Sequence, residues 1–86
     1  MDEMAQLRKQ VDKIDEQILS ALEERAKICK KIGSLKKQKG MQIRDTGREN
    51  QIYQLVKEKA VEFHLDPLQL EEVYREIVNM CSAVQE

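Results

Sequence analysis

Residues 4–39 read MAQLRKQVDKIDEQILSALEERAKICKKIGSLKKQK, a stretch with no proline and one glycine, Gly33. Its apolar residues recur every three or four positions, the period of one helix face. They are Leu7, Val11, Ile14, Ile18, Leu22, Cys29 and Ile32. A helix of this length spans roughly 50 Å, more than a globule of 86 residues needs. The stretch therefore predicts one overlong helix whose apolar stripe requires a partner surface.

Two cations interrupt this stripe. Arg25 falls between Leu22 and Cys29, and Lys36 follows Ile32 by four positions. Either residue alone is typical of a snorkelling or solvated cation. Together they lie nearly three whole turns apart on one face, at a separation of roughly 16 Å. A small molecule fits between them once the long side chains lean inward.

The composition is that of a single helical domain, residues 1–86. The chain has 3 glycines, 1 proline and 36% charged residues, which predicts an all-helical, soluble protein. A net charge of −1 argues against general affinity for nucleic acids or membranes. Residues 25–48 nevertheless contain nine basic residues and a single acid, Asp45. A balanced chain with one basic segment suits a small anionic ligand better than a polyanion.

The sequence carries no indication of membrane insertion or secretion. No apolar run approaches 18 residues, and the N-terminus has no apolar signal core. Cys29 and Cys81 lie far apart inside helical patterns, so we expect two small buried hydrophobic residues rather than a disulfide or a metal pair. We therefore expect a reducing, cytoplasmic location.

Two shorter helices follow a loop over residues 40–44. Asp45 is a good N-cap for the first of them, which should end near Phe63, while Asp66 and Pro67 mark the start of the second. Their expected apolar faces are Ile52, Leu55, Val56 and Lys59/Ala60, and then Leu70, Val73, Ile77, Met80 with Cys81, and Val84. The fold class is thus all-α, with one long and two short helices. Because each short helix covers only roughly 25 Å, two chains sharing their stripes are favoured over one chain folded alone.

Several short motifs occur in a distinctive order: L-R-x-x-[IV]-D-x-[IL]-D at residues 7–15, E-R at 24–25, Lys36, R-D-x-x-R-E at 44–49, H-L-D at 64–66, and Gln85. This ordered combination resembles the all-helical chorismate mutases over essentially the whole chain. The resemblance implies an intertwined homodimer of three helices per chain. It also implies two equivalent sites, each completed by one arginine from the partner chain.

The resemblance assigns roles to individual residues. Arg25 and Lys36 match positions that face the carboxylates of the substrate, and Arg8 matches the arginine that reaches in from the partner chain. Asp45 and Glu49 match positions that meet the ring hydroxyl, with Arg48 supporting them. Gln85 matches the residue that donates to the ether oxygen together with Lys36. Cys81 occupies a substrate-binding position where familiar members carry a hydroxyl residue such as serine, and its side chain is a weaker donor than a hydroxyl.

Helix geometry supports the partner's contribution independently. Arg8 and Lys36 are 28 residues apart, about 42 Å along one straight helix, and side chains that reach roughly 6–7 Å cannot close that distance. If both contact one small ligand, Arg8 must come from a second chain.

The implied reaction is the pericyclic rearrangement of chorismate to prephenate in the biosynthesis of phenylalanine and tyrosine. It needs no nucleophile, proton transfer, metal or other cofactor, so we expect none. It needs a dicarboxylate held in a reactive conformer, which arginines provide, and positive potential at the ether oxygen. We expect a monofunctional isomerase, with association with other enzymes of the aromatic pathway left open.

Two rival functions remain. An isochorismate pyruvate lyase on the same fold would resemble the mutases in its cations but lack the acidic pair, so Asp45 and Glu49 favour the mutase. A non-enzymatic helical adaptor, with its basic segment on an acidic partner, would suit the composition. That reading leaves Gln85 and the cations of the stripe unexplained.

Overall fold

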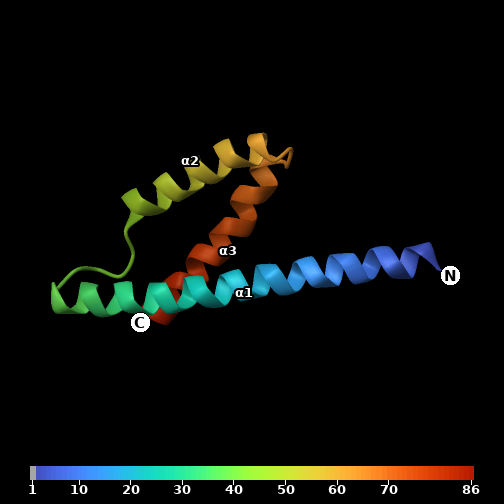
Figure 1. Ribbon diagram of the computed structural model, residues 1–86. Coiled ribbons are helices and arrows are strands. Elements are labelled where there is room, and N and C mark those ends of the chain that lie inside the picture. The colour runs from blue at the N-terminus through green and yellow to red at the C-terminus, as the bar shows by residue number, and fades with distance from the viewer. Residues whose placement is uncertain (1) are drawn as a thin grey trace.

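The computed structural model describes residues 2–86, which form three helices: α1 (Glu3–Gln38), α2 (Thr46–Glu62) and α3 (Pro67–Gln85). Figure 1 shows α1 as one long rod, with α2 and α3 joined as a hairpin over its C-terminal half. The N-terminal half of α1 projects beyond the other two helices. The predicted all-helical fold of one long and two short helices is confirmed. Within residues 2–86, no helix is long and apolar enough to cross a membrane.

Aspartate caps begin all three helices. The Asp2 carboxylate accepts from the main-chain N–H of Met4 at 3.0 Å, and Asp45 accepts from that of Arg48 at 3.0 Å. Asp66 accepts from two N–H groups, at 2.9 and 3.3 Å, and Pro67 follows it as the first helical residue. Each carboxylate satisfies an N–H group that has no partner inside the helix. The predicted caps Asp45 and Asp66 are therefore confirmed.

The ends of α1 and α2 use the left-handed region of the backbone. Lys39 caps α1, and Gly40 follows with φ +67°, where glycine avoids the steric cost of a Cβ. Phe63 caps α2, and His64 adopts φ +59° before the connector to α3. These two turns reverse the direction of the chain after α1 and again after α2, and α3 packs against both other helices.

The core of the single chain is small and centred on α3, which packs against both α1 and α2. Its buried apolar residues are Cys29, Tyr53, Val56, Ala60 and Val78, and its buried polar residues are Ser82 and Gln85. Val73 and Met80 had been expected on the core face, but they are 53% and 50% exposed in the single chain. The reason is the rotation of α3, which turns Val78 and Gln85 inward.

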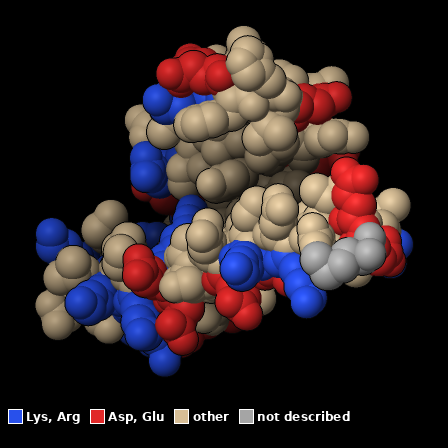
Figure 2. All heavy atoms as spheres, turned by 45° about the vertical axis from the view of Figure 1, so that its right-hand side comes forward, with Lys and Arg blue, Asp and Glu red and all other residues tan. Residues whose placement is uncertain are grey.

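The apolar stripe on the N-terminal half of α1 is uncovered. Met4, Leu7, Val11, Ile14 and Ile18 are each between 49% and 55% exposed. Figure 2 shows that uncharged residues also fill the middle of one face of the molecule, above the charged residues along α1. An apolar surface of this extent is typical of an interface with another protein.

A disulfide joins Cys29 on α1 to Cys81 on α3, with a Cα–Cα distance of 5.5 Å. The prediction of two separate, unpaired cysteines was wrong. The two positions are 52 residues apart in sequence, and only the packing of α3 along α1 brings them together. The bridge fixes α3 to α1 one helical turn before Gln85.

Candidate active site

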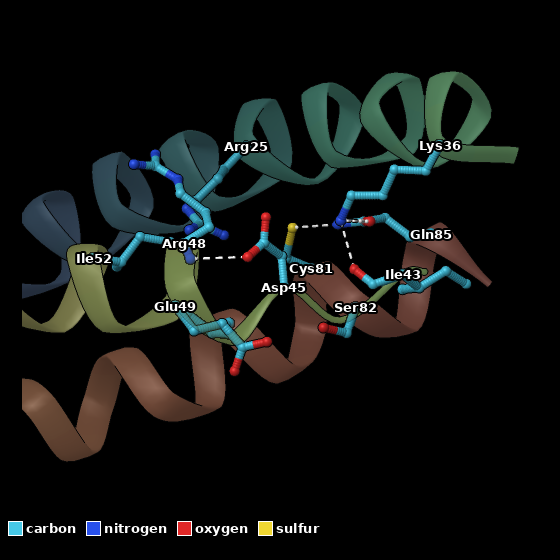
Figure 3. Close-up of a pocket in the computed structure, with 11 residues that line it drawn as sticks. Arg25, Lys36, Ile43, Asp45, Arg48, Glu49, Ile52, Cys81, Ser82 and Gln85 are labelled. Atoms are coloured by element: carbon cyan, nitrogen blue, oxygen red, sulfur yellow. Dashed lines mark hydrogen bonds between the residues drawn. The ribbon is translucent and has the colours of Figure 1, made fainter. Parts of the chain in front are cut away.

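A cleft opens between the C-terminal half of α1, the start of α2 and the end of α3. It consists of two adjoining cavities of about 60 and 370 Å³. The second volume is of the size typical of small-molecule sites. Residues that line both cavities are Arg25, Lys36, Asp45, Arg48, Ile52, Cys81 and Gln85, while Glu49 lines the smaller one. The structure thus brings together every predicted site residue except Arg8 (Figure 3).

Lys36 is held at the inner end of this cleft. Its ammonium donates to the main-chain oxygen of Ile43 and, at 2.8 Å, to Oε1 of Gln85. An ammonium group has three N–H donors, so these two bonds leave one for a ligand. Two acceptors, one in the loop before α2 and one on α3, therefore fix the position of the cation, which is the preorganisation that an electrostatic role requires.

The Gln85 amide has a defined orientation. Oε1 accepts from Lys36, which can only donate, so Nε2 points the other way and donates to Sγ of Cys81 at 3.0 Å. The residue is only 6% exposed although it is the last residue of α3. The second N–H of its amide can donate into the cleft beside the Lys36 ammonium.

The acidic pair at the start of α2 is held in two different ways. Asp45 caps the helix through the main-chain N–H of Arg48, whereas Glu49 is bound by Arg44 through two bonds of 2.9 Å each. Arg44 also donates to Asn79 on α3 at 3.2 Å. The hydrogen bond to Glu49 raises the pKa of the Arg44 guanidinium above its usual value. Arg44, more than Arg48, therefore orients the Glu49 carboxylate.

Arg25 occupies the opposite wall from this acidic pair. It is half-buried, and its Nη1 lies 3.8 Å from Sγ of Cys29, a weak contact that leaves most of its donors available. Figure 3 shows Arg25 and Lys36 reaching into the cleft from α1, with Arg48 opposite them on α2. Three cations around one small cavity create a site for a ligand with more than one anionic group.

Sequence reasoning missed four features of the cleft. The Ile43 carbonyl belongs to the main chain, so no side-chain pattern could reveal it. Arg44 was visible within the R-D-x-x-R-E motif but had been given no role. The Cys29–Cys81 disulfide and the packing of Gly33 on Gln85 depend on how α3 crosses α1. That crossing is not encoded in spacing along one helix.

Arg8 lies outside the cleft of its own chain. It is exposed on the N-terminal half of α1, a part of the helix that neither α2 nor α3 covers (Figure 1). Its distance along α1 from Lys36 is about 42 Å for 28 residues of helix. Within a single chain, Arg8 and Lys36 therefore cannot contact the same small ligand.

The fold and the cleft define an all-helical protein with a cation-lined pocket for a small polyanionic ligand. Residues 7–86 match the family described as chorismate mutase type II, and the chain belongs to that family, as the motifs had predicted. It is 38% identical over 88 residues to the bifunctional chorismate mutase/prephenate dehydratase of Aquifex aeolicus. That alignment covers 99% of this chain but only 24% of the relative.

This chain covers a larger share of two further relatives. The chorismate mutase of Methanocaldococcus jannaschii is 33% identical over 66 residues, covering 77% of this chain and 67% of the relative. A solved structure from Pyrococcus furiosus, titled as a conserved hypothetical protein, superimposes with a TM-score of 0.78 at 34% identity. It covers 100% of this chain and 99% of its own, which supports the three-helix arrangement as a whole.

Proposed function

We propose that this chain is a chorismate mutase, an isomerase that rearranges chorismate to prephenate. One observation carries the proposal: the Lys36 ammonium and the Gln85 amide hydrogen-bond each other at 2.8 Å and line the same cleft. Each retains a donor for one further acceptor, and they stand beside Arg25 and Arg48. A dicarboxylate with an ether oxygen between its two halves matches this set of donors.

The arginines would select the reactive conformer of the substrate. Guanidinium groups bind carboxylates with two parallel hydrogen bonds, which fix orientation as well as position. Arg25 would hold one carboxylate from α1, and Lys36 would contribute to binding the other. Holding the side chain of the substrate over its ring converts a rare conformer into the bound one, which lowers the barrier through orientation.

Lys36 and Gln85 would stabilise the transition state. As the bond between the ether oxygen and the ring lengthens, negative charge develops on that oxygen. Two fixed donors in a poorly hydrated cleft stabilise this charge more strongly than water does, because they need no reorganisation. No step requires a nucleophile, a proton transfer or a cofactor.

Asp45 and Glu49 would bind the hydroxyl on the substrate ring. A carboxylate held by Arg44 still has lone pairs for a further donor, so Glu49 can accept from a hydroxyl without losing its partner. Arg48 would support this cluster from the first turn of α2. Cys81 has no thiol proton in the disulfide, so we assign it no hydrogen-bond donation to substrate.

We further propose that the active form is a homodimer in which Arg8 enters the site of the partner. The exposed stripe on α1 supports this, because it needs a covering surface. So does a second groove of about 450 Å³, which shares Arg25 and Arg48 with the cleft. Its apolar lining includes Leu55, Phe63 and Leu70. The stripe of one copy and the groove of another are both apolar, so each can bury the other in a dimer.

The wider setting is proposed from the same family membership. In this proposal the reaction serves phenylalanine and tyrosine biosynthesis, residues 1–86 act as a single mutase domain, and the further partners are other enzymes of the aromatic pathway. The cytoplasm is the proposed location. The Cys29–Cys81 disulfide counts against this location, because disulfides are rare in a reducing cytoplasm.

The test is to follow the loss of chorismate absorbance with purified protein and to identify prephenate as the product. Isochorismate is assayed in parallel. Release of pyruvate from isochorismate without prephenate formation would reassign the site to the lyase. A folded dimer that turns over neither substrate would favour the helical adaptor.

A further inference from the structure

We propose that Gly33 is a positioning residue for Gln85: its missing side chain lets the last turn of α3 settle against α1, where the amide meets Lys36. The expected effect on kcat rests on the proposed mutase activity. The effect on the position of Gln85 rests only on the contact between Gly33 and Gln85.

The contact between Gly33 and Gln85 leaves no room for a methyl group. A Cβ built on Gly33 would lie 2.8 Å from Cα, 2.9 Å from Cβ and 3.0 Å from Cγ of Gln85. The first of these atoms is backbone, which cannot rotate away as the tip of a side chain can. Any side chain at residue 33 therefore requires α3 to move as a unit, or its last turn to unwind.

Gly33 also lies at the right place on α1 to act on the site. It is three residues before Lys36, and therefore directly beside it on the same helix face. The Gln85 side chain runs from this contact to the ammonium, where Oε1 accepts at 2.8 Å. Figure 3 shows Gln85 and Lys36 meeting at the inner end of the cleft. A shift at Gly33 is thus transmitted over one side-chain length to the proposed catalytic donors.

The disulfide makes the position of Gly33 more sensitive. Cys29 and Cys81 are each four residues before Gly33 and Gln85, so the two helices are bound one turn away from the contact. Because the disulfide holds α3 against α1 at this point, α3 cannot shift there to relieve the clash with the added Cβ. The remaining freedom is in the terminal turn, which carries Gln85.

The test is Gly33→Ala, alone and combined with Gln85→Ala. Because a displacement of about 1 Å at a reacting group costs roughly 100-fold in rate, we expect kcat to fall about 10- to 100-fold, with KM changed less than about threefold. In the Gln85→Ala background, where the amide is already gone, Gly33→Ala should lower kcat no further. A purely structural role would lower activity by the same factor in both backgrounds and would overturn the proposal.

Gly47→Ala is the matched control. It also places alanine at a helical glycine, but its Cβ would meet only a side-chain oxygen of Asp45 at 3.5 Å, an ordinary contact. We expect it to keep kcat. If Gly33→Ala does not fold in the disulfide-bonded chain, the substitution is repeated in Cys29→Ser, where α3 is free to yield. Equal kcat in Cys29→Ser with and without Gly33→Ala would then refute the positioning role.

A crystal structure of Gly33→Ala separates this inference from the proposed activity. We expect the distance from Lys36 Nζ to Gln85 Oε1 to lengthen beyond hydrogen-bonding range, about 3.5 Å. An unchanged distance refutes the inference whatever the enzyme does. Absence of chorismate turnover by the unmodified chain would instead reject the mutase assignment, while the crystallographic result would still decide the role of Gly33.

Discussion

Lys36 Nζ donates to Gln85 Oε1 at 2.8 Å and so joins α1 to the last helical residue of α3. The two residues are 49 positions apart, and each helps to orient the other. Lys36 selects which end of the amide faces it, and the amide oxygen keeps the ammonium inside the cleft. The two donors of the proposed transition-state site are therefore one structural unit.

Replacing Lys36 or Arg25 by alanine should abolish most turnover. Loss of one preorganised donor costs about 3–4 kcal/mol of transition-state stabilisation, roughly 100- to 1,000-fold in kcat. Helicity should be unchanged, because both positions are helical and alanine is the best helix former. Stopped assays of prephenate formation and far-UV circular dichroism measure the two quantities. Lys31→Ala, an exposed lysine on the same helix, serves as the control, and near-normal activity in Lys36→Ala would reject the site.

Gln85→Glu should make activity depend on pH. A carboxylate accepts hydrogen bonds and cannot donate one to the ether oxygen, whereas a protonated carboxyl can. The neighbouring Lys36 ammonium favours the charged carboxylate, so the variant should be weak at neutral pH and gain activity as the pH falls. The profile of kcat against pH is the measurement, with the unmodified chain as reference. A flat profile for the variant would show that Gln85 does not act as a donor.

Much of this architecture could be predicted from the sequence, because the signals for a helix, its caps and its periodicity, lie within the helix's own segment. The caps Asp45 and Asp66 and the 3.6-residue period set the elements, and the ordered motifs identified the cleft residues. The disulfide and the packing of Gly33 against Gln85 could not be predicted. They follow from the rotation and crossing of α3 on α1, which depend on contacts between residues about 50 positions apart. The same rotation explains why Val73 and Met80 lie outside the core of the single chain.

Reducing the Cys29–Cys81 disulfide should lower thermal stability markedly. The bridge closes a loop with a sequence separation of 52 residues, which on chain-entropy grounds contributes about 4 kcal/mol to the free energy of unfolding. In a domain of this size each kcal/mol shifts Tm by roughly 4–8 °C, so a loss of more than about 10 °C is expected. Melting curves with and without a reductant measure it. Cys29→Ser should melt at the lower temperature and ignore the reductant; equal curves for the unmodified chain would contradict the prediction.

Acid should weaken the packing of α2 on α3 through Glu71. Lys57 on α2 binds Glu71 at 2.7 Å and Arg75 binds it at 2.6 Å, and these hydrogen bonds lower the pKa of the carboxyl, that to Lys57 most. Because the folded pKa lies below the unfolded value of about 4.5, the stabilisation is complete above that value. It is lost as the pH falls through the folded pKa.

Denaturant unfolding across this acid range tests the role of Glu71. Glu71→Gln should be less stable than the unmodified chain near neutral pH, and the difference should shrink below about pH 4.5. Glu72→Gln, at the exposed neighbouring position, is the control and should leave the pH dependence as it is. A constant difference between Glu71→Gln and the unmodified chain at every pH would contradict the linkage.

Mixed dimers test whether Arg8 serves the site of the partner. Arg8→Ala and Lys36→Ala should each be nearly inactive alone, because every site in either homodimer lacks one cation. When the two variants are unfolded together and refolded at equal concentrations, half the dimers contain one chain of each kind. One site in such a dimer combines the intact Lys36 of one chain with the intact Arg8 of the other, and the second site lacks both. Activity should recover to about a quarter of that of the unmodified protein, as two-fold symmetry requires. If Arg8 acted within its own chain, every site would carry one defect and mixing would restore nothing.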